Sequence, residues 1–292
     1  MPVSPGHHFN LLTILLLSII CCHEGTSSPL VAAELQYPVA VAVGPSGTIY
    51  VADRKLPGIW QLKNEKLEVF VPGDKKFGGF LNAIRCLAID GDGQLLVGDS
   101  ATREIYRIDK EKKITPLTSR GIGIPMDIAV TAQGDLLVSD LELHCVWKVA
   151  KAGGKPTKLA TLAGPSGVAL DDKQHLWVVS RAKNPLQKIL PDGTLETVVA
   201  KRPFQFPNDV IVDKNGVAFV TDSYQKCIWK VVPGQPPESW VSGGSLQNPV
   251  GVTWSGQDLI VVDSRARDVF KISADGKTIT SLTGKEASLD QK

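Results

Sequence analysis

Short apolar runs, separated by turns rich in glycine, asparagine and aspartate, recur along the chain with a period of about 40 residues. The clearest copy contains three such runs, at residues 207–213, 217–222 and 228–231. A fixed period of this length, made of short apolar runs, is typical of β-propeller blades. The six copies, spaced by 46, 41, 40, 42 and 42 residues, begin at Pro38, Ile84, Pro125, Pro165, Pro207 and Pro249.

Each copy predicts four short strands. The first two runs flank a turn such as residues 213–216, which is typical of a β-hairpin. In most copies the third run has an aromatic residue seven positions after an acidic one, as Trp229 follows Asp222, and a weaker fourth run closes the unit. We therefore predict an all-β fold, a six-bladed β-propeller of four-stranded antiparallel blades over residues 34–284. The ring closes either end to end or with residues 34–37 as an extra strand on the sixth blade.

The first 33 residues lie outside the repeat and include an apolar run of 12 residues, at positions 11–22. A membrane-spanning helix needs about 20 residues, so this run is typical of a secretory signal peptide, cleaved after Ala33. We therefore expect a secreted protein, extracellular or periplasmic. No Lys or Arg precedes the run, and the alternative is an uncleaved segment that attaches the chain to a membrane. Residues 285–292 are predicted to form a disordered tail.

The composition limits the choice of partners. A net charge of only +2 gives no general attraction to nucleic acid or to membranes, and a hydrophobic content of 43% suits a folded domain.

After cleavage three cysteines remain, Cys86, Cys145 and Cys227, and an odd number at these repeat positions does not indicate a disulfide framework. We predict that all three are small buried side chains.

An acidic residue ends the second run of every copy except the fourth, which has Ser180. These residues are Asp53, Asp99, Asp140, Asp222 and Asp263. Five carboxylates in register resemble a catalytic or metal-binding ring, but blade symmetry spreads them around the rim. Aspartate at a strand end accepts hydrogen bonds from the backbone of the adjoining loop. We therefore predict a structural role for the whole series.

The repeat resembles that of the NHL-repeat propeller family over residues 37–284. The residues that carry the resemblance in the fifth copy are Pro207, Asp213, Gly216, Val220, Asp222 and Ile228. The resemblance implies the fold, and it says little about function, because function depends on sites grafted onto a fold.

Part of the fifth copy is also similar to the gluconolactonase-like, regucalcin-type hydrolases, at residues 206–209 and 219–222. This resemblance implies a divalent metal in the channel mouth. A hard dication needs several oxygen ligands, yet the position after the start of each copy holds Val39, Arg85, Met126, Ser166, Asn208 and Val250. We therefore predict no metal site, no cofactor and no catalytic residue. The alternative is a lactonase or related hydrolase that holds calcium or another divalent metal with Asn208, Asp209 and Asp127. The residues expected at the channel mouth are Met126, Asp127, Ser166, Asn208 and Asp209.

Positive charge is concentrated in the loops that follow the second strands. In a four-stranded blade these loops lie on the same face as the channel mouth, and they contain eight Lys or Arg against one Glu. With Arg85 near the channel, the predicted basic face comprises Arg54, Lys55, Arg85, Arg103, Arg181, Lys183, Lys226, Arg265 and Arg267. Clustered charge of this kind attracts an anionic partner in a salt-dependent way.

We therefore expect a secreted, non-enzymatic binding module that takes an acidic glycan, peptide or protein on its basic loop face. Nucleic acid is not expected, because the loops lack a series of aromatics for base stacking, Tyr224 being the lone candidate. A third interpretation is a sensor domain whose apolar N-terminal run stays in the membrane. The long loop at residues 72–80, with Phe77 and Phe80, is a second candidate contact surface.

Overall fold

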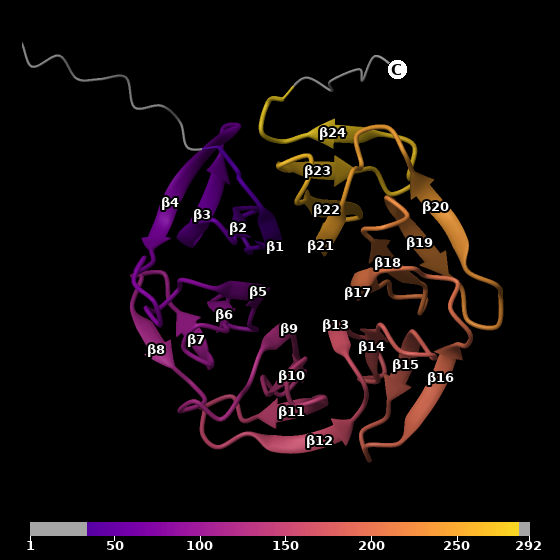
Figure 1. The fold of residues 1–292 in the computed structure, drawn as a ribbon, viewed down its shortest axis with the longest axis horizontal. Coiled ribbons are helices and arrows are strands. Elements are labelled where there is room, and N and C mark those ends of the chain that lie inside the picture. Colours follow the sequence, from indigo (N-terminus) through magenta and orange to yellow (C-terminus); the bar gives the residue numbers. More distant parts are fainter. Residues whose placement is uncertain (1–33, 286–292) are drawn as a thin grey trace, which may run out of the picture. The chain divides into compact units, whose positions relative to one another are not determined.

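The computed structural model describes residues 34–285, which form six four-stranded antiparallel sheets. Figure 1 shows the sheets as blades set around a central axis, in the order of the sequence. The inner strands that surround the axis are β1 (Pro38–Val43), β5 (Ile84–Ile89), β9 (Pro125–Val130), β13 (Pro165–Leu170), β17 (Pro207–Val212) and β21 (Pro249–Ser255). All six residues predicted to begin a copy therefore begin an inner strand, and the predicted propeller is confirmed.

The remaining strands follow outward in each blade. The second strands are β2 (Ile49–Asp53), β6 (Leu95–Asp99), β10 (Leu136–Asp140), β14 (Leu176–Ser180), β18 (Ala218–Asp222) and β22 (Asp258–Asp263). The third strands are β3 (Leu56–Lys63), β7 (Glu104–Ile108), β11 (Cys145–Val149), β15 (Leu186–Ile189), β19 (Cys227–Val231) and β23 (Asp268–Ile272). The outer strands are β4 (Lys66–Pro72), β8 (Ile114–Pro116), β12 (Thr157–Thr161), β16 (Leu195–Val199), β20 (Glu238–Ser242) and β24 (Ile279–Ser281).

The core lies between neighbouring blades. Every residue of β6, β10, β14 and β18 is buried, as expected of strands covered on both faces. Each of the six apolar clusters combines side chains of two adjacent blades, so burial of apolar surface is what holds one blade to the next. The three cysteines of this region are buried free thiols, as predicted.

The ring closes without strand exchange. The sixth sheet consists of β21–β24 alone, and residues 34–37 form no strand. Leu35 is instead buried with Val41 of the first blade and Ile260 and Val262 of the sixth. The same place, three residues before the inner strand, holds a buried apolar side chain in every blade: Leu35, Leu81, Ile122, Leu162, Phe204 and Leu246. Residues 34–37 therefore act as the ordinary connector of the first blade, and closure is end to end.

Two predictions concern residues outside the described part of the chain. The signal peptide at residues 1–33 lies there entirely, and so does the predicted tail except for Lys285. Within residues 34–285 there is no helix of the length and apolar character needed to cross a membrane.

Candidate functional site

The aspartates that end the second strands shape the loops beside the channel. The Asp140 carboxylate accepts backbone N–H bonds from Gly123 and Ile124, which lead into β9, and from Glu142 and Leu143, which follow β10. Four other blades repeat this arrangement, with acceptors Asp53, Asp99, Asp222 and Asp263. Such bonds satisfy loop amides that would otherwise be unpaired. The predicted structural role is therefore confirmed.

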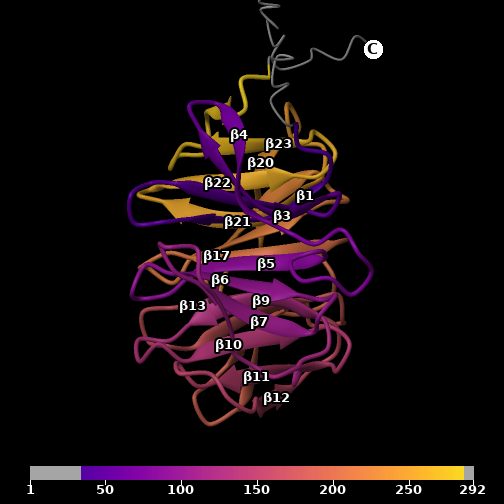
Figure 2. The same cartoon turned by 90° about the vertical axis from the view of Figure 1, so that its left-hand side faces the viewer.

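The side of the ring that these aspartates organise is called here the mouth face. Strand register places the end of each second strand opposite the start of the inner strand, as in Asp222 opposite Pro207. The mouth face therefore carries both the first residues of the inner strands and the loops at residues 54–55, 100–103, 141–144, 181–184, 223–226 and 264–267. Figure 2 shows the blades edge-on, with loops along both sides of the ring.

The nine predicted basic residues divide into two groups on this face. Arg54, Arg85 and Arg181 line a central cavity of about 490 Å³. The others lie outside the cavity with exposed side chains: Lys55, Arg103, Lys183, Lys226, Arg265 and Arg267. The single acidic residue of the loops, Glu142, is 2.7 Å from Arg103 and neutralises only that cation. The mouth face therefore keeps an excess of unpaired positive charge.

The cavity is the central channel, whose lining runs from the mouth face to Val43 and Ile89 at the far ends of β1 and β5. All five residues predicted there line it: Met126, Asp127, Ser166, Asn208 and Asp209. Phe206, Asn248 and Ser264 also line it and were not predicted. Phe206 directly precedes the inner strand β17, and that position in the repeat is the sequence signal that could have identified it.

Asp127 and Asp209 form a pair of carboxyl groups in the wall of this cavity. Burial is the main cause that raises the pKa of both, to about 6 for Asp209 and well above the usual value for Asp127, which also feels the charge of Asp209. Each carboxyl group bridges two blades: Asp127 accepts from Ile128 N and Val168 N, and Asp209 accepts from Val210 N and Val252 N, all at 2.8 Å. Both carboxyl groups therefore take up a proton more readily than an ordinary aspartate, and each of their four oxygens accepts one backbone N–H bond.

The cavity does not fit a divalent metal. Asn208 directs its side-chain oxygen toward the Arg181 guanidinium, 3.4 Å away, and a cation beside that guanidinium would be repelled. The oxygens of Asp127 and Asp209 are engaged as described, and Val39 and Val250 contribute no donor. Within residues 34–285 no group of three or more His, Cys, Asp or Glu side chains is arranged to hold a metal ion.

Large apolar side chains are exposed beside the basic residues. Seven are exposed in the described part of the chain, and two of these, Val69 and Leu195, lie on the outer strands β4 and β16. The other five lie in mouth-face loops or in connectors that lead into inner strands: Phe77, Phe80, Leu143, Phe206 and Tyr224. Phe77 is fully exposed at the tip of its loop. Exposed aromatics among arginines are typical of protein-binding surfaces.

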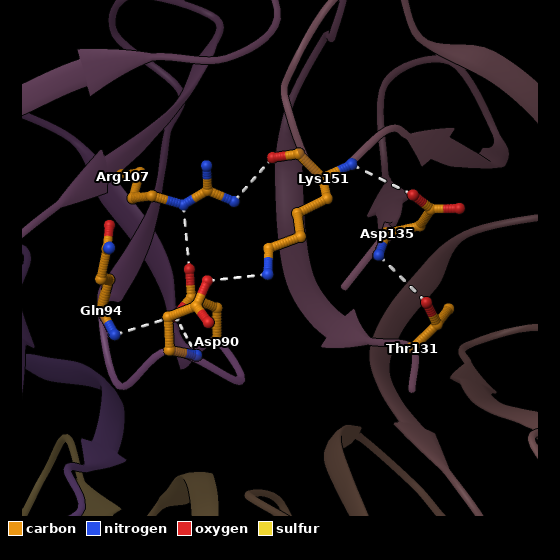
Figure 3. Close-up of polar contacts among 7 residues, drawn as sticks. Asp90, Gln94, Arg107, Thr131, Asp135 and Lys151 are labelled. Carbon is orange, nitrogen blue, oxygen red and sulfur yellow. Dashed lines mark hydrogen bonds and ion pairs between the residues drawn. The ribbon is translucent and has the colours of Figure 1, made fainter. Parts of the chain in front are cut away.

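The opposite side, here called the turn face, consists of the turns between first and second and between third and fourth strands. Figure 3 shows its network between the second and third blades. Arg107 Nε lies 2.9 Å from Asp90, and Arg107 also donates to the Lys151 carbonyl oxygen at 2.8 Å. The Lys151 ammonium lies 2.8 Å from Asp92, and its backbone N–H donates to Asp135. The charged side chains of this network are therefore paired within the protein.

Comparison with known proteins supports the fold. No protein-family model matches the chain. A segment of 65 residues is 40% identical to the E3 ubiquitin-protein ligase TRIM32 of Mus musculus and 38% identical to that of Homo sapiens. This segment is 21% of the chain and spans only a tenth of the length of these curated relatives. It is consistent with the resemblance to NHL-repeat propellers.

Similar solved structures cover most of the chain at low identity. A gluconolactonase from Xanthomonas campestris has a TM-score of 0.66 at 16% identity, covering 82% of this chain and 86% of its own. A chain of a nidogen/laminin complex has a TM-score of 0.66 at 19% identity, covering 84% and 91%. Virginiamycin B lyase from Staphylococcus aureus has a TM-score of 0.65 at 16% identity, covering 85% and 86%. The chain is thus a six-bladed β-propeller. The three similar structures named here are two enzymes and a chain of a protein complex.

Proposed function

We propose that the protein is a secreted, non-enzymatic binding module whose mouth face binds an acidic protein or peptide. The observation that carries this proposal is the charge of the exposed loops on that face, which contain eight Lys or Arg and one carboxylate, Glu142, itself paired with Arg103. Unpaired charge of one sign accelerates the association of an oppositely charged partner.

The exposed apolar side chains favour a polypeptide over an acidic glycan. Phe77, Leu143 and Tyr224 are exposed in mouth-face loops and connectors, and side chains of this kind contribute to binding by packing into apolar pockets of a partner. A solved neighbour that belongs to a nidogen/laminin complex supports a protein partner in general terms. The export of the chain is inferred from the apolar run at residues 11–22.

A hydrolase of the gluconolactonase type is the alternative, and the likeness to the Xanthomonas campestris enzyme supports it at the level of fold. The donor set of the cavity does not favour it, because Asn208 and the two aspartates are engaged within the protein. Binding without catalysis is therefore the function that we propose.

The test measures the dissociation constant of a decaglutamate peptide containing one central phenylalanine. A mouth-face variant replaces Lys183, Lys226, Arg265 and Arg267 by serine. The matched control replaces four turn-face cations, Lys110, Lys148, Lys271 and Lys277, by serine and so removes the same charge. We expect the mouth-face variant to bind at least about tenfold more weakly and the control to bind like the parent. Equal losses in both variants would show that only net charge matters and would contradict the proposal.

A parallel titration with heparin separates the two classes of partner. A peptide site that uses Phe77 and Tyr224 should lose affinity for the peptide, but not for heparin, in a Phe77→Ser/Tyr224→Ser variant. Equal affinity of this variant for the peptide would argue against a polypeptide partner.

A further inference from the structure

The central cavity contains arginine side chains with no ionic partner in residues 34–285. Arg54, Arg85 and Arg181 line the cavity, and none of them forms an ion pair with a carboxylate in this part of the chain. Guanidinium groups are matched in shape to carboxylate and phosphate oxygens, which they bind through paired hydrogen bonds. A cavity of about 490 Å³ with three free guanidinium groups is therefore suited to an anion.

Arg181 is held in place, but its hydrogen-bonding capacity is not used up. Its guanidinium lies over the Phe206 ring, 3.7 Å from the ring centroid, and donates to Asn208 Oδ1 at 3.4 Å. Its Nε is buried and has no hydrogen-bond partner, the only side-chain nitrogen or oxygen in residues 34–285 in this condition. A buried donor without an acceptor costs free energy, so an oxyanion that supplied the acceptor would be bound favourably.

Arg54 and Arg85 form a second positive site in the cavity. Burial and then the charge of Arg54 lower the pKa of the half-buried Arg85. Arg85 Nε donates to Ser100 Oγ at 3.2 Å, which fixes the side chain and leaves its terminal nitrogens for another acceptor. An anion between the two guanidinium groups would relieve their mutual repulsion.

The two sites lie on opposite sides of the channel. Arg54 and Arg85 belong to the first and second blades, whereas Arg181 and Asn208 belong to the fourth and fifth. In a ring of six, the first blade faces the fourth and the second faces the fifth, as Figure 1 shows for β1 and β13 and for β5 and β17. The buried aspartates of the wall form no ion pair with these arginines in residues 34–285, and their oxygens accept backbone N–H bonds of the inner strands.

We propose that this cavity binds an anion with two oxyanion groups, one at Arg54 and Arg85 and the other at Arg181, with Phe206 beside the latter. This inference deepens the proposed function and rests on it, because the cavity opens on the mouth face. The anion is either a free small molecule or a pair of acidic groups that the polypeptide partner inserts. In both cases the exposed cations outside the cavity attract the ligand, and the inner arginines recognise it.

The test titrates adipate, with hexanoate as the matched monoanion, into the full-length protein by calorimetry. We expect adipate to bind at least tenfold more tightly than hexanoate. Arg85→Gln and Arg181→Gln should each weaken adipate binding at least tenfold, and Lys277→Gln, which removes an exposed cation of the turn face, should change it less than twofold. The melting temperature without ligand shows whether each variant is folded. Phe206→Leu, which leaves every charge in place, should weaken adipate binding about threefold.

The outcomes separate this inference from the proposed function. Equal affinity for adipate and hexanoate, or the same loss in Lys277→Gln as in Arg181→Gln, would overturn the inference. Binding of the glutamate peptide without binding of adipate would overturn it and leave the proposed function intact, whereas binding of adipate without binding of the peptide would overturn the proposed function and leave a free small molecule as the ligand of the cavity. Displacement of the peptide by adipate would support a ligand presented by the partner, whereas simultaneous binding would support a free small molecule in the same cavity.

Discussion

The two faces of this propeller differ in how many of their charged side chains form ion pairs within the chain. Six of the seven Lys or Arg ion pairs in residues 34–285 lie at turns of the turn face, including the network of Arg107, Asp90, Lys151 and Asp92. The mouth face has one such pair, Arg103 with Glu142, and leaves its other loop cations without a carboxylate in this part of the chain. Charge that is paired within the chain stabilises the fold, and charge left unpaired on one face is available to a partner.

The largest effect is expected on stability, at an aspartate that holds the mouth-face loops in place rather than at a residue that contacts the partner. Asp140→Ala should lower the free energy of unfolding by about 3–5 kcal/mol, because it leaves four loop amides and the Trp147 indole N–H without their acceptor. Chemical denaturation measures the change. Asp172→Ala, at an exposed turn residue, is the control and should have almost no effect. A loss of less than about 1 kcal/mol in Asp140→Ala would contradict the structural role.

The next largest effect is a difference between the two faces in how much one cation contributes to stability. Arg107→Met should lower the free energy of unfolding by about 2 kcal/mol, because it leaves the buried Asp90 carboxylate without its cation. Lys183→Met removes an exposed cation of the mouth face and should change stability by less than about 0.5 kcal/mol. Denaturation curves of the two variants give the comparison directly. Similar losses in both would show that mouth-face cations also serve the fold.

A smaller effect concerns pH. The raised pKa of Asp209, about 6, means that acidification below that value removes negative charge from the cavity wall. The affinity for 1,4-butanedisulfonate, whose charge is constant, should therefore rise about threefold between pH 7.5 and pH 5, measured by calorimetry. His144→Gln controls for the imidazole on the same face. Asp209→Asn should bind this dianion equally at the two pH values, and an unchanged pH response in that variant would contradict the assignment.

The smallest effect tests whether the loop cations are there for stability. Arg103, Lys226 and Arg267 have positive φ angles of 59°, 54° and 56°, a conformation that favours glycine. Replacing each by glycine should leave the free energy of unfolding unchanged or raise it by up to about 0.5 kcal/mol, while weakening binding of the glutamate peptide. A clear loss of stability, seen by denaturation, would indicate that these side chains support the loops.

The sequence predicted the fold and the basic loops because both follow from local patterns. The starting residues of the copies, Pro38 among them, mark the inner strands, and strand register then places the loop cations on one face. The inner arrangement of the cavity was not predictable in this way. It depends on contacts between blades, such as Arg181 over Phe206. Gly167 is another case, because a Cβ there would lie 2.4 Å from the Asp209 Cα, and only glycine permits that approach.

Hydrogen exchange with and without the glutamate peptide shows whether the mouth face is the binding face. Backbone amides of the mouth-face loops at residues 100–103, 223–226 and 264–267 should exchange more slowly in the complex. The turn-face turns at residues 90–93, 131–134 and 213–216 should exchange at the same rate with and without the peptide. Protection confined to those turns, or spread equally over both faces, would show that the mouth face is not the binding face.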